Sequence, residues 1–146
     1  LENQLRSFRA GWRGTHPDDY HGGEMRPMAV AIGDDDAVRE AADYFAAFDA
    51  PELVDTVEGD ATRGRTLYAT CTACHGANGK GNQALGAPAI AGQSDWYMVR
   101  QLEHFRSGVR GAADGDTWGA SMAAMSGTLT DEQAIRDVVA YINTLD

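Results

Sequence analysis

Cys71-Thr72-Ala73-Cys74-His75 contains both cysteines of this 146-residue chain and follows the pattern C-x-x-C-H. The pattern is typical of covalent attachment of a c-type haem. Cysteines three apart on a helical turn project from the same side, so Cys71 and Cys74 can both add to the vinyl groups on one edge of a porphyrin. His75 then lies beneath the iron and supplies the proximal nitrogen. We therefore predict one covalently bound haem c with His75 as an iron ligand.

Two other kinds of site and a structural disulfide also use closely spaced cysteines. A thioredoxin-like redox pair requires a strand–helix–strand context, which the sequence does not show. A tetrahedral zinc site requires four ligands, but the chain has no second cysteine pair, and its other histidines show no ligand spacing close to the first pair. A disulfide is the third alternative to haem attachment.

Helical patterns lie on both sides of the motif. Residues 60–70 begin with an acidic residue and run directly into the attachment turn. Ser94-Asp95 is a candidate N-cap for a helix from about Trp96 to Arg106, and Thr130–Gln133 is a capping box before a final helix with apolar residues at helical spacing. Because no segment shows the convincing alternation of a strand, we predict an all-α fold.

Five short motifs cover almost all of the second half of the chain. They are C-x-x-C-H at 71–75, G-x-x-G-x-G at 76–81, P-x-I-A-G-Q at 88–93, Y-x-x-x-Q-L-x-x-F-R-x-G at 97–108, and M-x-x-M with a following L-T-D at 122–131. With these motifs, residues 60–146 resemble a class I cytochrome c domain, most similar to those of bacterial two-haem periplasmic cytochromes. The resemblance implies a helical fold around one haem, His and Met as axial ligands, and electron transfer as the function.

Three methionines after the haem motif are candidates for the sixth iron ligand. Met98 falls inside an expected helix, where a methionine is a packing residue. Met122 and Met125 fall in a small-residue loop at 119–125, where backbone can approach a flat cofactor. In the family pattern the first methionine of M-x-x-M is the ligand, so the resemblance implies that Met122 binds iron and Met125 lines the pocket. Two alternatives stay open: Met125 as the ligand, or both methionines as core residues beside an open iron.

A proximal histidine needs a hydrogen-bond acceptor for its other ring nitrogen, which fixes the orientation of the ring. Pro88 resembles the family proline whose backbone carbonyl has this role. The resemblance therefore implies that Pro88 belongs to the haem-binding site, whereas the sequence alone predicts only a turn at this position.

Residues 1–49 repeat residues 98–146 at a constant offset of 97 positions without a gap, and 16 of the 49 aligned residues are identical. We therefore divide the chain into the C-terminal half of a first cytochrome c repeat without a haem motif (1–49), a linker (50–59) and a cytochrome c domain with one haem (60–146). Identical pairs include Gln4 and Gln101, Phe8 and Phe105, Arg13 and Arg110, and Met25 and Met122.

The half of the first repeat that would carry a haem motif is not in the sequence, and three explanations compete. The chain is a piece of a larger two-haem protein, or a degenerate first domain is retained for packing, or another chain supplies the haem-bearing half by a domain swap. We favour the first, because the sequence opens inside an expected helix.

About fifty residues without a cofactor cannot form a sufficient core. We therefore expect the apolar residues of 1–49 to cover the second domain, another chain or both, which would allow a homodimer or a domain swap through residues 1–49. These residues are Phe8, Trp12, Val30, Ile32, Tyr44, Phe45 and Phe48.

The chain is acidic, with 12 Lys and Arg against 22 Asp and Glu and a net charge of −10. This balance argues against nucleic acid or an anionic membrane surface as a partner. No apolar run approaches the roughly 20 residues that a membrane helix requires, and the first residues show no signal-peptide pattern. A covalent haem and a mature N-terminus together indicate the periplasm. An acidic surface would select redox partners with a basic docking face.

A haem with both axial positions filled by the protein has no open coordination site, so it transfers electrons and performs no bond chemistry. Our first hypothesis is therefore a periplasmic electron carrier, or the carrier domain of a larger redox protein, and not an enzyme. A haem enzyme or gas sensor with an open or displaceable sixth position is the alternative. A third, weaker hypothesis is a structural module in which the haem only supports folding.

Overall fold

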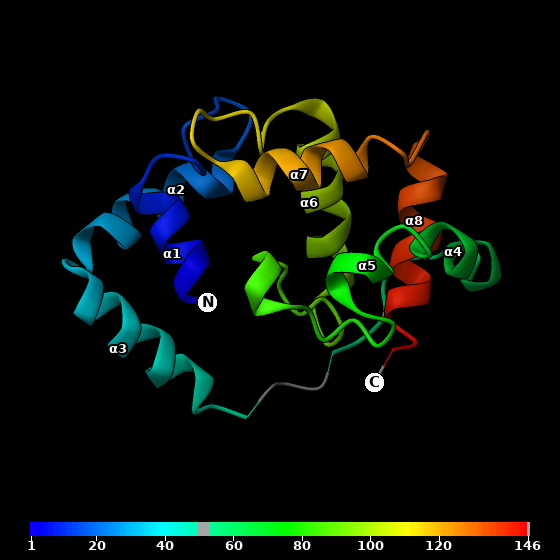
Figure 1. The fold of residues 1–146 in the computed structure, drawn as a ribbon, viewed down its shortest axis with the longest axis horizontal. Coiled ribbons are helices and arrows are strands. Elements are labelled where there is room, and N and C mark those ends of the chain that lie inside the picture. The colour runs from blue at the N-terminus through cyan, green and yellow to red at the C-terminus, as the bar shows by residue number, and fades with distance from the viewer. Residues whose placement is uncertain (50–52, 146) are drawn as a thin grey trace.

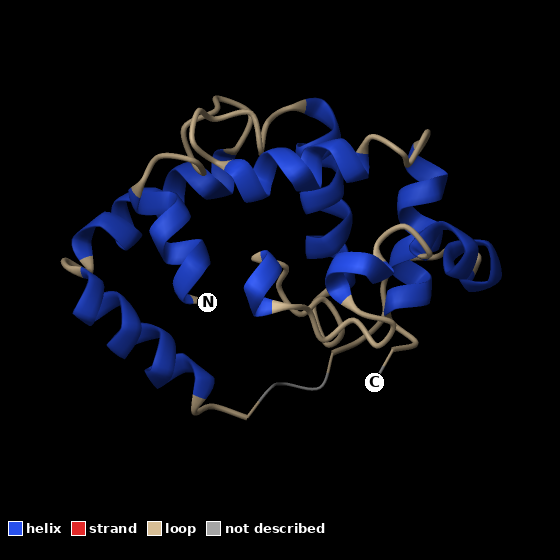
Figure 2. Cartoon of the chain, in the orientation of Figure 1, coloured by secondary structure: helices blue, strands red, loops and turns tan. Residues whose placement is uncertain are grey.

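The computed structural model describes residues 1–49 and 53–145, and every regular element in these ranges is helical (Figure 2). The expected all-α fold is confirmed, with one isolated bridge between Asn82 and Ala87. Residues 50–52 of the expected linker lie outside the described residues. The elements are α1 (Glu2–Arg9), α2 (Tyr20–Ala31), α3 (Asp35–Ala46), α4 (Ala61–Tyr68), α5 (Thr72–His75), the 3-10 helix η1 (Gln83–Leu85), α6 (Asp95–Ser107), α7 (Thr117–Ser126) and α8 (Glu132–Ile142).

None of the helices that the structure describes combines the length and the apolar character needed to cross a membrane.

The sequence repeat reappears as a repeat of helices. The three helices α1, α2 and α3 follow the same order as α6, α7 and α8, and each lies close to the offset of 97 residues from its counterpart (Figure 1). In both sets the first helix packs against the second and the third. Residues 1–49 therefore fold as a half-repeat with the packing of the last three helices.

Aspartates begin the helices of both repeats, and this changes two expected caps. Oδ1 of Asp131 accepts a hydrogen bond from the N–H of Ala134 at 2.7 Å, so α8 is capped by Asp131 and not by Thr130. Ser94 is the N-cap of α6 but makes no side-chain capping bond. The carboxylate of Asp95 instead accepts hydrogen bonds from the N–H and the hydroxyl of Thr56, the latter at 2.9 Å. It also accepts one from the N–H of Val57 at 2.7 Å.

The expected small-residue loop at 119–125 is wrong, because these residues form most of α7. Oδ1 of Asp116 caps this helix by accepting from the N–H of Gly119 at 2.8 Å. The following residues include alanines and methionines, which are strong helix formers, so a cap and a favourable composition together produce a helix.

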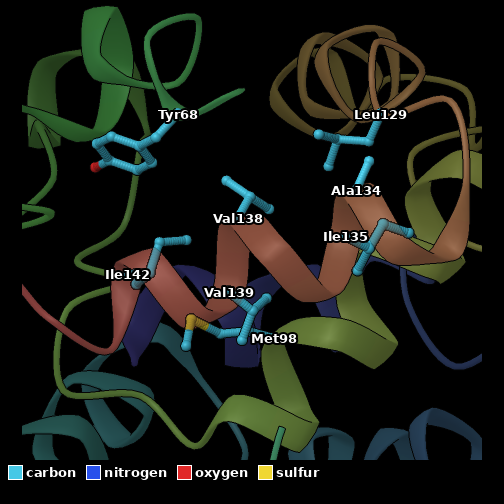
Figure 3. Close-up of a cluster of buried hydrophobic side chains, with 8 residues drawn as sticks. All are labelled: Tyr68, Met98, Leu129, Ala134, Ile135, Val138, Val139 and Ile142. Carbon is cyan, nitrogen blue, oxygen red and sulfur yellow. The ribbon is translucent and has the colours of Figure 1, made fainter. Parts of the chain in front are cut away.

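The two repeats have separate hydrophobic cores. Five buried residues of α8 form the centre of the larger core, against Tyr68 of α4 and Met98 of α6 (Figure 3). Met98 is therefore a packing residue, as expected. Val57 also packs against this core, so part of the expected linker belongs to the second repeat. The smaller core lies within the half-repeat and consists of Leu5, Phe8, Ala29 and Val38, with Ile32 and Ala41 packed against it.

Several apolar residues of the half-repeat do not cover the second repeat, so for them only the other expected cover, another chain, stays a prediction. Tyr44 of α3 is 64% exposed and Phe48, just after α3, is 58% exposed, and the two rings pack edge-to-face. Their counterparts are Tyr141 of α8 and Leu145, just after α8, which pack against the larger core instead. Val30 and Phe45 are exposed in the same way, whereas Phe8 is buried.

Helices α4 and α8 pack closely against each other. A Cβ atom at Gly64 would lie 1.9 Å from the carbonyl oxygen of Asp137, so only glycine permits this approach. The buried carboxylate of Asp137 accepts from the N–H of Asp60 at 2.8 Å and from the guanidinium of Arg63 at 2.6 Å. Burial acts to raise the pKa of Asp137, but these bonds and one from Gln133 outweigh it and lower the pKa.

Gly64→Ala should lower the free energy of unfolding by about 2–3 kcal/mol, because the added methyl group separates α4 from α8. Gly23→Ala is the matched control, since Gly23 is also helical and a Cβ atom there meets nothing within 4 Å. We expect this control to be neutral or stabilising by up to about 1 kcal/mol. Denaturant unfolding followed by circular dichroism measures both, and equal effects would contradict the packing argument.

Candidate functional site

The two cysteines of the motif lie on one short helix. Cys71 is the N-cap of α5, and the N–H groups of Cys74 and His75 donate to its carbonyl oxygen at 3.2 and 2.9 Å. Both thiols are free, so the disulfide alternative finds no support. Cys71 is half-buried against the larger core and Cys74 is exposed. Burial raises the pKa of Cys71, so this thiol is protonated at neutral pH.

The imidazole of His75 is buried and held in one orientation. Its Nδ1 atom lies 2.9 Å from the backbone oxygen of Pro88. A carbonyl oxygen can only accept a hydrogen bond, so Nδ1 carries the proton and donates it. In the neutral ring Nε2 is then unprotonated, and it makes no hydrogen bond with any described residue. This nitrogen is therefore the one available to bind a metal ion.

Glycines close the loop that brings Pro88 to His75. The N–H of Gly81 donates to the His75 carbonyl at 2.8 Å, and the Gly79 carbonyl accepts from the N–H of Ile90 at 2.7 Å. Gly81 has a φ of +79°, and a Cβ atom there would lie 2.5 Å from the carbonyl carbon of Pro88. The position therefore requires glycine both for its backbone conformation and for the space beside Pro88.

The methionines of the M-x-x-M motif lie on α7. Met122 is half-buried, Met125 is 44% exposed, and their spacing of three places both on the same side of the helix. Trp118, also on α7, contacts Gly86 directly after η1, where an added Cβ would lie 2.2 Å from the indole ring. The indole of Trp118 thus reaches from α7 to the residue that follows η1.

These residues fit a covalent haem. Two free thiols on one turn, a buried imidazole with Nε2 available, and a methionine-bearing helix supply the attachment and ligand groups. Large apolar side chains exposed in this repeat supply a surface for a flat hydrophobic ring: Leu85, Trp96, Trp118 and Met125. No group of three or more His, Cys, Asp or Glu that could hold a metal ion occurs in the described part of the chain, so the zinc alternative finds no support.

Sequence reasoning missed a hydrogen-bonded ring of four side chains between the repeats, which we call the inter-repeat ring. Nη1 of Arg13 donates to Oε1 of Gln4 at 2.6 Å, and its Nη2 donates to Oε1 of Gln101 at 3.2 Å. Nη1 of Arg110 donates to Gln101 at 2.6 Å, and its Nη2 donates to Gln4 at 2.8 Å. The two glutamines are identical at the repeat offset, and so are the two arginines. This identity is the sequence signal from which the ring could have been found.

Residues 61–146 match the family model described as Cytochrome c. A cytochrome c4 of Azotobacter vinelandii is 34% identical over 89 residues, which cover 59% of this chain and 41% of the relative. A thiosulfate dehydrogenase electron acceptor of Stutzerimonas stutzeri is 30% identical over 158 residues, covering 95% of this chain and 70% of the relative. The structure of reduced cytochrome c4 from Pseudomonas stutzeri aligns with a TM-score of 0.73 at 28% identity, covering 100% of this chain and 80% of that one. The chain thus spans about two fifths of the length of the Azotobacter relative.

Gly81→Ala should destabilise the haem-loaded protein by more than Gly92→Ala, although both residues have a positive φ. Each alanine costs about 1–2 kcal/mol in backbone strain. Only the methyl group at position 81 also displaces Pro88, since nothing lies within 4 Å of a Cβ at Gly92. Thermal unfolding and the ratio of bound haem to protein measure the difference. Equal loss in both variants would show that the Pro88 contact is unimportant.

Proposed function

Since the chain belongs to the cytochrome c family, we propose that it transfers single electrons through one haem bound covalently by Cys71 and Cys74. The observation that carries this proposal is the buried His75, with Nδ1 fixed by Pro88 and Nε2 available for iron. The family match over residues 61–146 covers the same part of the chain. A c-type haem supplies an iron that changes between Fe(II) and Fe(III), and the protein sets its ligands and surroundings.

His75 and Met122 are the axial ligands in this proposal. Pro88 positions His75, and the same hydrogen bond increases the electron density at Nε2. Two observations support Met122 over Met125: it is the first methionine of the family pattern, and it is half-buried where Met125 is 44% exposed. A thioether sulfur favours Fe(II) and so raises the reduction potential. With both axial positions filled, the protein is a carrier and not an enzyme.

Residues 1–49 are, in this proposal, the methionine half of a further cytochrome repeat in a larger protein. On α8, Tyr141 contacts Tyr68 of α4, with ring centroids 5.3 Å apart. The counterpart of Tyr141 on α3 is Tyr44, which is 64% exposed. A helix of the α4 type would cover this face. The similarity of residues from both repeats to part of a longer Stutzerimonas protein supports the same arrangement.

We assign the protein to the periplasm and expect its partners to be redox proteins with a basic docking face. The net charge of −10 supports a basic partner. The Stutzerimonas relative is named as an electron acceptor of thiosulfate dehydrogenase, which makes an oxidoreductase of this class a candidate electron donor.

Met122→Ala should abolish the weak red absorption band by which oxidised members of the family report a methionine sulfur on iron. Met125→Ala is the matched control on the same helix and should retain the band, because in this proposal the sulfur of Met125 does not bind iron. A reversible one-electron redox titration should show a lower potential for Met122→Ala only.

Three results would contradict this assignment. Loss of the band in Met125→Ala alone would make Met125 the ligand. Absence of the band in the wild type, with rapid carbon monoxide binding to the reduced protein, would favour a haem enzyme or gas sensor. A protein without a reversible one-electron wave would be a structural module.

Electron transfer with a basic redox protein should slow as the salt concentration rises, because screening weakens attraction between unlike charged surfaces. Stopped-flow mixing at low and high ionic strength measures the rate constant, and an acidic redox protein of similar potential is the control. A rate constant for the basic protein that does not depend on salt would contradict charge-directed docking.

A further inference from the structure

The two repeats meet through residues that occupy equivalent positions. In the inter-repeat ring, Arg13 contacts Gln101 and Arg110 contacts Gln4, so these two contacts across the boundary are counterparts of each other. Arg13 also donates to the hydroxyl of Tyr97 at 3.4 Å. Such reciprocity is the property of an isologous interface, in which the same surface occurs on both sides. The surface of the half-repeat and that of the second repeat are therefore related by an approximate two-fold axis.

The surroundings of the ring obey the same relation. The guanidinium of Arg13 lies over the ring of Phe8 at 4.2 Å, and that of Arg110 lies over Phe105 at 4.4 Å. The loops that carry the two arginines also match, because Gly14 and Gly111 have φ angles of +73° and +83°. The two repeats therefore match in the hydrogen bonds of the ring and also in the backbone conformation of the loops that carry the arginines.

The two glutamine oxygens of the ring accept all of their bonds only when two such surfaces face each other. Each glutamine oxygen accepts one hydrogen bond from the arginine of its own repeat and one from the arginine of the other. No carboxylate among the described residues forms a salt bridge with Arg13 or Arg110. Burial, and then the charge of Arg13, lower the pKa of Arg110 to about 10. An isolated surface would leave half of these acceptor bonds unmade.

We propose that the surface of the second repeat around Gln101, Phe105 and Arg110 binds a second copy of itself, and that residues 1–49 normally occupy it. The half-repeat presents the same three residue types as Gln4, Phe8 and Arg13, so it takes the place of the second copy. The expected partner is therefore another molecule of this chain whose half-repeat is also displaced. The resulting dimer is symmetric, with one inter-repeat ring built from two copies of Gln101 and Arg110.

One difference between the repeats at this boundary makes pairing of two copies weaker than binding of the half-repeat. Trp12, which lies beside Gly115, is replaced by the smaller Val109 in the second repeat. Nδ1 of His104 lies 3.8 Å from Oδ1 of Asp19, and this contact is retained in a dimer, because the partner subunit's Asp116 supplies the same carboxylate. The half-repeat is also tethered, so its effective concentration is high and the intact chain should be a monomer.

The separate cores allow the half-repeat to be unfolded selectively. Leu5 and Val38 are buried in the smaller core, and neither belongs to the core of the second repeat. Leu5→Asp combined with Val38→Asp places two charges in that core and leaves all four residues of the inter-repeat ring in the sequence. The matched control carries these substitutions together with Gln101→Ala and Arg110→Ala.

Sedimentation velocity of the haem-loaded full-length chains, over a range of protein concentrations, tests the proposal. We expect the wild type to remain at the mass of one chain, and the Leu5→Asp, Val38→Asp variant to double its mass as concentration rises. The control should need at least about tenfold more protein to dimerise, because it lacks the ring. The haem absorption spectrum verifies that the second repeat is folded in each variant.

Two results would overturn the proposal. A monomeric Leu5→Asp, Val38→Asp variant with an intact haem spectrum would show that the exposed surface does not pair. Equal association of this variant and its control would show that the unfolded half-repeat, and not the ring, causes the association.

Discussion

The hydrogen bond between Nδ1 of His75 and the Pro88 carbonyl joins segments 13 residues apart and defines the site. It fixes the tautomer of the imidazole and so determines which nitrogen is available for iron. The loop between the two residues has to close tightly for this bond to form, which explains the positive φ of Gly81 and its contact with Pro88. A glycine at position 81 is thus required for Nδ1 of His75 to donate its proton to the Pro88 carbonyl.

The local features of the site could be predicted from the sequence, because they depend on neighbouring residues. The haem-attachment pattern, the all-α fold and the class I cytochrome c resemblance rest on short motifs, and the fold and the family are confirmed. The loop expected around Met122 is wrong, because glycine and small residues do not by themselves prevent a helix. A single cap at Asp116 was enough for the same residues to form a helix.

Long-range contacts could not be predicted in the same way. Asp95 was expected to cap α6, but its carboxylate accepts three hydrogen bonds from Thr56 and Val57. The inter-repeat ring also joins residues far apart, with Gln4 and Arg110 separated by 106 positions. Nothing in a local pattern distinguishes a surface arginine from one that crosses a boundary between repeats. The identity of both residue pairs at a constant offset becomes informative only when the two surfaces are known to face each other.

The packing of α4 against α8 also sets an order of events during biosynthesis. Asp60 and Arg63 contact Asp137, which lies 77 and 74 positions later in the chain. Contacts of such sequence separation form late, because the intervening chain must first be synthesised and its loop closed. In the unfolded chain α8 is not yet packed against α4, so the larger core does not cover Cys71. The thiol of Cys71 is therefore more accessible before the fold closes than after it.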